Sequence, residues 1–186
     1  MHPKGISLGI IASIAGLDEA TVAQTIENQQ NTKTMLQQKV RVSKQFNFEM
    51  AHALYGYDGP CRNIHGHTYH LRVTIKGFPI TDDSDVKLGM VMDFGNLKKV
   101  VMEEIISIYD HALVLNDSAP YVKNELLTSE FEKVFTVPFQ PTCENLMLMF
   151  LEKIRPYFTG DLELVGVELR ETPTSYAEWR LEDNEG

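Results

Sequence analysis

Two stretches of alternating apolar and polar residues form the most strongly patterned part of the chain. Between Val40 and His52 the even positions are apolar, apart from Lys44, and the odd positions are polar. A period of two is typical of a half-buried β-strand, so His52 is expected on the apolar face. A second run of this kind covers residues 65–76, with its apolar residues at the odd positions. The two runs predict neighbouring strands.

Three of the histidines share the apolar faces of these predicted strands. His65 and His67 open the second strand in its apolar phase, whereas His70 points to the other face. If the strands pair, His52, His65 and His67 converge from one side of the sheet. Three imidazoles with a fourth position open are the ligand set of catalytic zinc. We therefore predict a Zn²⁺ site here; the alternative is a set of surface histidines on a hairpin.

The rest of the patterned region predicts helices packed on this sheet. Residues 117–140 contain two prolines and show no clear period. A run of strands and helices without βαβ alternation indicates an α+β fold with an antiparallel sheet. The predicted elements are a short strand at Met90–Met92, a helix with Asp93 as N-cap, a helix with Thr142 as N-cap, a strand at Leu162–Arg170 and a candidate extension of the sheet at Tyr176–Leu181.

The N-terminal residues differ from the rest in composition, being rich in Ala, Gln, Asn and Thr. Asp18 is expected to cap a short helix over residues 19–27. We predict that residues 1–38 form an extension, partly helical or disordered, and that residues 39–186 form one domain.

Charge and composition exclude several classes of function. The 186 residues carry a net charge of -9 and no Lys/Arg run, which argues against a nucleic-acid surface. No apolar run approaches the roughly 18 residues that span a bilayer. The 2 cysteines form no disulfide framework and fit a reducing compartment. We expect a cytoplasmic protein without a membrane partner.

A thiol and two acidic positions are the other candidates for chemistry. Cys61 lies four residues before His65, where a nearby cation would favour the thiolate, a base or nucleophile; the alternative is a small buried loop residue. The adjacent Asp110 and His111 form a candidate acid/base group, and we expect their partner to come from another element. Glu171 ends an apolar strand face, where a carboxylate needs a partner. That partner is either a heterocycle with two N–H donors or an arginine.

These residues lie in motifs that resemble the 6-pyruvoyl-tetrahydropterin synthase / 6-carboxytetrahydropterin synthase family. The resemblance covers residues 40–181, in the order of the family. The motifs are F-x-F-x-M-A-H ending at His52, C-R-N-I-H-G-H-T-Y over 61–69, G-M-V-M-D-F over 89–94, D-H over 110–111, P-T-C-E-N over 141–145 and E-T-P-T-S-Y-A-E-W over 171–179.

The resemblance implies a T-fold, an antiparallel four-stranded sheet with two helices on one face. It implies a homohexamer built as a dimer of trimers, with active sites between subunits. Zinc would be held by the three histidines. Cys61 would be the catalytic thiol, with Asp110 and His111 completing a relay from a neighbouring subunit. Glu171 would anchor the pterin, in a pocket lined by the Thr142 region.

The spacing of Cys61 from the His-Gly-His motif resembles that of the bacterial 6-carboxytetrahydropterin synthases. The implied activity is that of a lyase, which converts 7,8-dihydroneopterin triphosphate to 6-carboxytetrahydropterin with loss of acetaldehyde and triphosphate, on the route to queuosine. Two alternatives stay open. One is formation of 6-pyruvoyl-tetrahydropterin, and the other is a non-catalytic protein that binds zinc or pterin.

Overall fold

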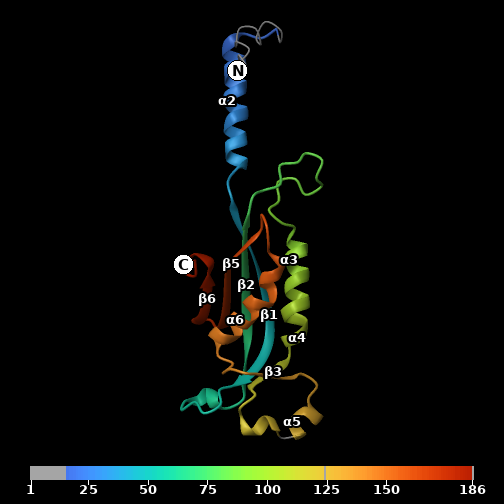
Figure 1. The fold of residues 1–186 in the computed structure, drawn as a ribbon, viewed down its shortest axis with the longest axis vertical. Coiled ribbons are helices and arrows are strands. Elements are labelled where there is room, and N and C mark those ends of the chain that lie inside the picture. Colours follow the sequence, from blue (N-terminus) through green and yellow to red (C-terminus); the bar gives the residue numbers. More distant parts are fainter. Residues whose placement is uncertain (1–15, 124, 186) are drawn as a thin grey trace.

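The computed structural model describes residues 16–123 and 125–185, and leaves the side chains of 32–36, 125, 126 and 128 undescribed. Its centre is an antiparallel pair of long strands, β1 (Val40–Ala53) and β2 (His65–Gly77), shown in Figure 1. His52 lies directly opposite His65 in this pair. The two strands predicted from the period of two are confirmed, and their side chains lie on the faces that the period predicts.

The full sheet is mixed and has six strands, in the order β4-β3-β1-β2-β5-β6. The prediction of four antiparallel strands is therefore wrong. The strands beyond the central pair are β3 (Ala112–Asn116), β4 (Val134–Val137), β5 (Glu163–Thr172) and β6 (Ser175–Arg180). β3 runs parallel to β1, and β4 runs parallel to β3. Parallel neighbours need a crossover, which helical segments supply before β3 and between β3 and β4.

The strand predicted at Met90–Met92 is also wrong, because these residues belong to a loop. Gly89 has a φ of +83°, which turns the chain just before them. Two backbone hydrogen bonds close the loop at Ile80. Ile80 N donates to Met90 O, and Gly89 N donates to Ile80 O, both at 2.9 Å. The pairing does not extend into a β-ladder. The third strand of the chain is instead β3, which pairs with β1.

Two helical segments pack on one face of the sheet, as expected (Figure 1). The first is α3 (Phe94–Val101), which continues through a π-helical turn at Met102–Ile106 into α4 (Ser107–Tyr109). The second is α6 (Cys143–Ile154). Both predicted N-caps are confirmed: Asp93 Oδ1 accepts from Gly95 N at 2.7 Å, and Thr142 Oγ1 accepts from Asn145 N at 3.4 Å.

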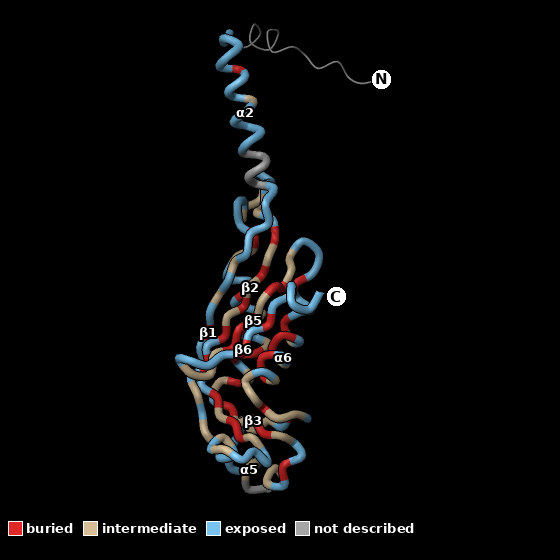
Figure 2. The backbone as a smooth tube through the Cα atoms, turned by 90° about the vertical axis from the view of Figure 1, so that its left-hand side faces the viewer, coloured by how far each residue is buried: buried red, intermediate tan, exposed pale blue. Residues whose placement is uncertain are grey.

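The core lies between these helices and the apolar face of the sheet, where buried segments cluster in Figure 2. Each fully buried aliphatic side chain contributes about 1.5–3 kcal/mol relative to exposure, which makes this face the main source of stability. β2 supplies four side chains with no exposed surface: Tyr69, Leu71, Val73 and Ile75.

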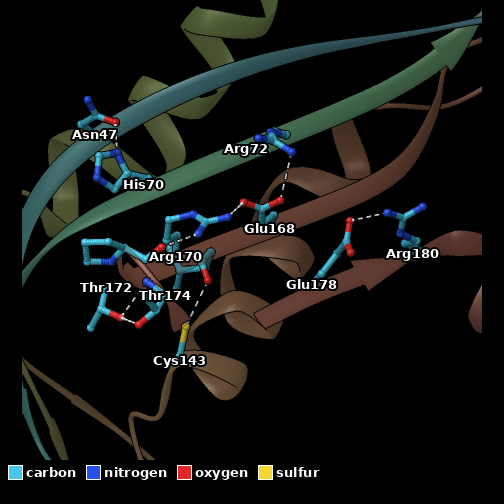
Figure 3. A network of polar contacts seen from close by, with 12 residues as sticks. Asn47, His70, Arg72, Cys143, Glu168, Arg170, Thr172, Thr174, Glu178 and Arg180 are labelled. Atoms are coloured by element: carbon cyan, nitrogen blue, oxygen red, sulfur yellow. Dashed lines mark hydrogen bonds and ion pairs between the residues drawn. The ribbon is translucent and has the colours of Figure 1, made fainter. Parts of the chain in front are cut away.

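The opposite face of the sheet carries polar side chains from β1, β2, β5 and β6. Figure 3 shows its central network, in which the carboxylate of Glu168 accepts from Arg72 Nη1 at 3.0 Å and from Arg170 Nη2 at 3.2 Å. Glu168 is only 8% exposed, so its charge is tolerated because two guanidinium groups pair with it. His70 lies on this face too and contacts Asn47, as its phase predicted.

The N-terminal helix α2 (Glu19–Leu36) extends away from the sheet (Figure 1). It is longer than the predicted 19–27, and Asp18 caps it by accepting from Thr21 N at 2.9 Å. Residues 1–15 of the predicted extension lie outside the described residues. In the part of the chain that the structure describes, no helix combines the length and apolar character needed to cross a membrane. Short elements η3 (Pro120–Lys123) and α5 (Glu125–Glu130) precede β4.

Candidate metal centre and catalytic site

The structure brings His52, His65 and His67 together, as the strand phases predicted. One ring nitrogen from each lies within 4.8 Å of the others. The Nε2 atoms of His52 and His65 are 3.1 Å apart. His52 comes from the end of β1 and is 2% exposed, whereas the other two open β2. The geometry follows from direct cross-strand pairing, because paired residues point to the same face.

Backbone carbonyls orient two of these imidazoles. His52 Nδ1 lies 2.6 Å from Pro141 O, and His65 Nδ1 lies 2.8 Å from Asn63 O. A carbonyl only accepts, so each Nδ1 is assigned the proton and each Nε2 is left with its lone pair facing the cluster. This is the arrangement in which histidines bind a metal ion.

The electrostatics of the cluster also favour a cation. Burial lowers the pKa of His52 and of His67, so both rings hold the neutral, ligating form. His67 Nε2 is buried and has no hydrogen-bond partner among the described residues. An orphaned buried nitrogen is costly unless something occupies its lone pair. The three residues therefore fit a bound divalent metal ion.

Glu171, at the end of β5, lies over the cluster. Its Oε1 is 3.4 Å from His52 Nε2 and 3.7 Å from His67 Nε2, and it accepts a 3.0 Å hydrogen bond from the hydroxyl of Tyr69. The partners that the structure gives Glu171 are therefore Tyr69 and two histidines, and the arginine alternative is not observed in the described residues. The carboxylate is 21% exposed and can still meet a ligand.

Cys61 lies in a short 3₁₀ turn, Pro60–Arg62, in the loop between β1 and β2. Its carbonyl accepts from Leu54 N at 2.9 Å, which closes the loop, and the residue is half-buried. Among the described residues, the Cys61 thiol is not one of the ligand groups that cluster with the three histidines. Its catalytic role stays a prediction.

Asp110 and His111 contact each other, which was not expected of adjacent residues, and Asp110 also has a partner on another element, as expected. Asp110 Oδ1 lies 3.1 Å from His111 Nδ1 and accepts from Glu49 N at 3.0 Å. The left-handed backbone of His111, with φ +62°, makes this adjacent pairing possible. The Glu49 N–H, followed by smaller effects including His111, lowers the pKa of Asp110, so the carboxylate stays charged.

The His111 side chain is 75% exposed. It lines a hollow of about 370 Å³, whose other lining residues are Glu49, Met50, Ala51, Gly66, His67, Thr68 and Ala112. Four of these residues alternate along β1 and β2 with the clustered histidines, whereas His67 belongs to the cluster. The relay of Asp110 and His111 with Cys61 stays a prediction.

Thr142 and Cys143 have structural contacts at the start of α6. Thr142 is half-buried and caps the helix, so its predicted contact with substrate stays a prediction. The Cys143 thiol donates to Leu169 O at 3.2 Å, and burial raises its pKa to about 12 (Figure 3). A thiol held protonated in this way fits packing rather than nucleophilic chemistry.

Two groups of the site were not predicted from the sequence. Tyr69 shares the phase of His65 and His67, so its place on their face could have been predicted, but its hydrogen bond to Glu171 could not. The Pro141 carbonyl, which orients His52, carries no sequence signal, because backbone contacts depend on where α6 begins in space.

The fold and the three-histidine centre define a metal-binding α+β protein with a carboxylate beside the metal position. The family model that matches residues 41–182 is described as 6-pyruvoyl tetrahydropterin synthase. A relative from Haemophilus influenzae named 6-carboxy-5,6,7,8-tetrahydropterin synthase is 37% identical over 142 residues, which cover 75% of this chain and 98% of the relative. The chain belongs to the 6-pyruvoyl tetrahydropterin synthase family, an enzyme family, as its motifs predicted.

Other relatives agree. A protein of the same name from Aquifex aeolicus is 28% identical over 167 residues, covering 77% of this chain and 99% of that protein. A Caenorhabditis elegans 6-pyruvoyl tetrahydropterin synthase structure has a TM-score of 0.53 at 24% identity, covering 77% of this chain and 96% of that one. An uncharacterized Wolinella succinogenes protein has a TM-score of 0.60 at 20% identity, covering 77% and 99%. These structures share the fold, the T-fold of the family.

Proposed function

We propose that the protein converts 7,8-dihydroneopterin triphosphate to 6-carboxy-5,6,7,8-tetrahydropterin, with loss of acetaldehyde and triphosphate, and that it depends on zinc. The observation that carries the proposal is the position of the Glu171 carboxylate, 3.4 Å from a nitrogen of the three-histidine cluster. This position places a carboxylate that can accept hydrogen bonds from a pterin ring directly beside the metal position. The names of the curated relatives support the choice of product.

The donor set favours zinc. Structural zinc sites are usually closed by cysteines, whereas catalytic sites use three protein ligands and leave one position open. Three neutral imidazoles match the second case. Bound zinc would supply Lewis acidity that lowers the pKa of the substrate's side-chain hydroxyls.

The chain's own residues then divide the remaining work. Glu171 accepts two N–H groups of the pterin, and Tyr69 fixes the carboxylate for this contact. The thiolate of Cys61 moves protons at the side-chain carbons, and His111 is its counterpart. Asp110 contacts Nδ1 of His111 and orients its imidazole.

We further propose that Asp110 and His111 act on the site of a neighbouring subunit in a homohexamer. One observation supports this assembly: the side chain of His111 is largely exposed, beside a hollow that it lines together with His67 and neighbouring strand residues. A left-handed backbone at an exposed histidine costs free energy. Contact with a neighbouring subunit would give this conformation of His111 a function.

A second candidate is formation of 6-pyruvoyl-tetrahydropterin. It is favoured by the name of the family whose model matches residues 41–182, 6-pyruvoyl tetrahydropterin synthase. Solved structures of the same fold from Caenorhabditis elegans and Plasmodium falciparum bear this name as well. The two reactions would use the same residues and differ in whether the side chain is cleaved.

The deciding experiment incubates the zinc-loaded protein with 7,8-dihydroneopterin triphosphate and identifies the products by mass spectrometry. Release of acetaldehyde with a 6-carboxy product supports the first candidate. A pyruvoyl product without acetaldehyde supports the second. Binding without any turnover would leave a non-catalytic pterin- or zinc-binding protein and overturn both.

A further inference from the structure

Gln140, just before α6, contacts the loop that carries Cys61. Its side-chain oxygen accepts from Tyr55 N at 3.1 Å, and its side-chain nitrogen donates to Tyr55 O. A glutamine amide has a donor and an acceptor like those of a peptide group, so it can pair with both backbone groups of one residue. Gln140 thus pairs with Tyr55 as a neighbouring strand would.

The backbone beside Gln140 serves the metal centre and the helix. The next residue, Pro141, offers its carbonyl to His52 Nδ1 at 2.6 Å. The carbonyl of Gln140 itself accepts from Thr142 N at 2.8 Å and from Asn145 Nδ2 at 3.0 Å, at the start of α6. The main chain of Gln140 is therefore fixed to the same segment that orients a metal ligand.

The start of the loop from Leu54 to Asn63 has two further contacts. Leu54 N donates to Cys61 O at 2.9 Å, and the ring of Tyr55 meets the ring of Tyr121 edge-on, with centroids 6.0 Å apart. The end of the loop reaches a metal ligand, because Asn63 O lies 2.8 Å from His65 Nδ1. The two backbone contacts of Tyr55 with Gln140 link the start of the loop to the segment that orients His52.

We propose that Gln140 is a positioning residue, which fixes the Cys61 loop relative to the histidine cluster through the backbone of Tyr55. The role rests on the proposed function, because it matters for turnover only if Cys61 is the catalytic thiol. Gln140 touches no reacting group itself. It acts by fixing the position of the Cys61 thiol. Small displacements of a reacting group lower the reaction rate by a large factor.

The test uses the full-length, zinc-loaded protein and the variants Gln140→Met and Gln140→Glu. Methionine keeps the length of the side chain and removes both contacts with Tyr55, together with the 3.4 Å contact that Asn116 Nδ2 donates to Gln140 Oε1. Glutamate keeps the acceptor for Tyr55 N and Asn116 and sets a carboxylate against Tyr55 O. The matched control is Gln45→Met, since Gln45 lies beside Arg72 on the opposite face of the sheet. Alkylation of each thiol by iodoacetamide is followed by peptide mass spectrometry, with Cys143 as internal reference.

In both Gln140 variants we expect the alkylation rate of Cys61 to change several-fold while that of Cys143 and the zinc content stay native. We expect kcat on 7,8-dihydroneopterin triphosphate to fall about tenfold with KM little changed. The control should match the native protein in every readout.

Native kcat and native Cys61 alkylation in both variants would overturn the proposal, as would equal changes at Cys61 and Cys143, which indicate general loosening. If Gln140→Met fails to fold, Gln140→Glu decides on the same criteria. Absence of turnover in the native protein would overturn the proposed function instead. The alkylation rates would then still test whether Gln140 positions the loop.

Discussion

The hydroxyl of Tyr69, a fully buried residue of β2, donates a 3.0 Å hydrogen bond to Oε1 of Glu171 on the neighbouring strand β5. The same oxygen lies 3.4 Å from Nε2 of His52. The carboxylate is therefore held between a phenol and the metal position. This contact joins the proposed pterin anchor to the core of the protein.

Replacing Tyr69 by Phe should weaken substrate binding without loss of zinc. One hydrogen bond to a charged group is removed, so we expect KM for the pterin triphosphate to rise about tenfold. Steady-state kinetics and zinc analysis measure both effects. The matched control is Tyr109→Phe, because that hydroxyl contacts Met149 Sδ, at 3.6 Å, rather than a group of the site. A native KM in the Tyr69→Phe variant would show that the hydrogen bond from Tyr69 to Glu171 does not contribute to substrate binding.

Replacing His52 by Ala should remove the metal. Loss of a metal ligand lowers metal affinity more than loss of a hydrogen-bond partner of a ligand does. We therefore expect zinc affinity to fall by more than about 100-fold. Competition with a chelating dye gives the affinity. His70→Ala is the control, since His70 faces away and contacts Asn47. Equal zinc affinity in the two variants would contradict the three-histidine centre.

Replacing Cys61 by Ala should abolish turnover while zinc stays near one per subunit. The thiol is not among the clustered ligands, so the metal centre does not depend on it. Product formation and metal content are measured on the same sample. Turnover at the native rate would end the assignment of Cys61 as the catalytic thiol.

Replacing Asp110 by Asn should lower kcat by about 10²-fold, because the carboxylate that orients the imidazole of His111 is lost. If the pair serves a neighbouring subunit, mixing inactive Cys61→Ala and Asp110→Asn subunits should restore part of the activity. The mixed oligomers would contain some sites with both native groups. No recovery after refolding the two variants together would argue for a relay within one chain.

Glu163 supplies a pH dependence of stability. Hydrogen bonds from Lys39, and then from Lys76 at 2.8 Å, lower its pKa to about 2. Because the pKa of Glu163 is lower in the folded state than its ordinary value of 4.5, its contribution to the stability of the fold is complete above pH 4.5. The contribution is lost as the pH falls toward 2. Glu163→Gln should lower the Tm by a few degrees at neutral pH, since the pair is partly exposed. Thermal melts of the two proteins should converge as pH falls through this window; a constant difference would contradict the assignment.

The metal centre was predictable because its information is local. His52, His65 and His67 lie on strands whose period of two is visible in consecutive residues, and their convergence needs only that the strands pair. The caps at Asp93 and Thr142 were predictable for the same reason, since a cap bonds to a residue two or three positions away.

The sheet beyond its central pair was not predictable in this way. β4 lies in a segment without a clear period, and it is a strand because β3 offers it an edge. The predicted strand at Met90–Met92 failed because a short apolar run forms a strand only where a partner is available. The parallel direction of β3 depends on the crossover that precedes it.

The amino-acid pattern was enough to predict two central strands, the face that each strand histidine occupies and the N-caps of the helices, because each depends on the chemistry of near neighbours along the chain. The packing of the elements in space determines that Tyr69 contacts Glu171, that Gln140 contacts Tyr55 and that His111 lines a hollow with His67. These contacts join residues far apart in sequence, or depend on a left-handed backbone at one position. Their geometry is set by the packing of whole elements, which no local pattern records.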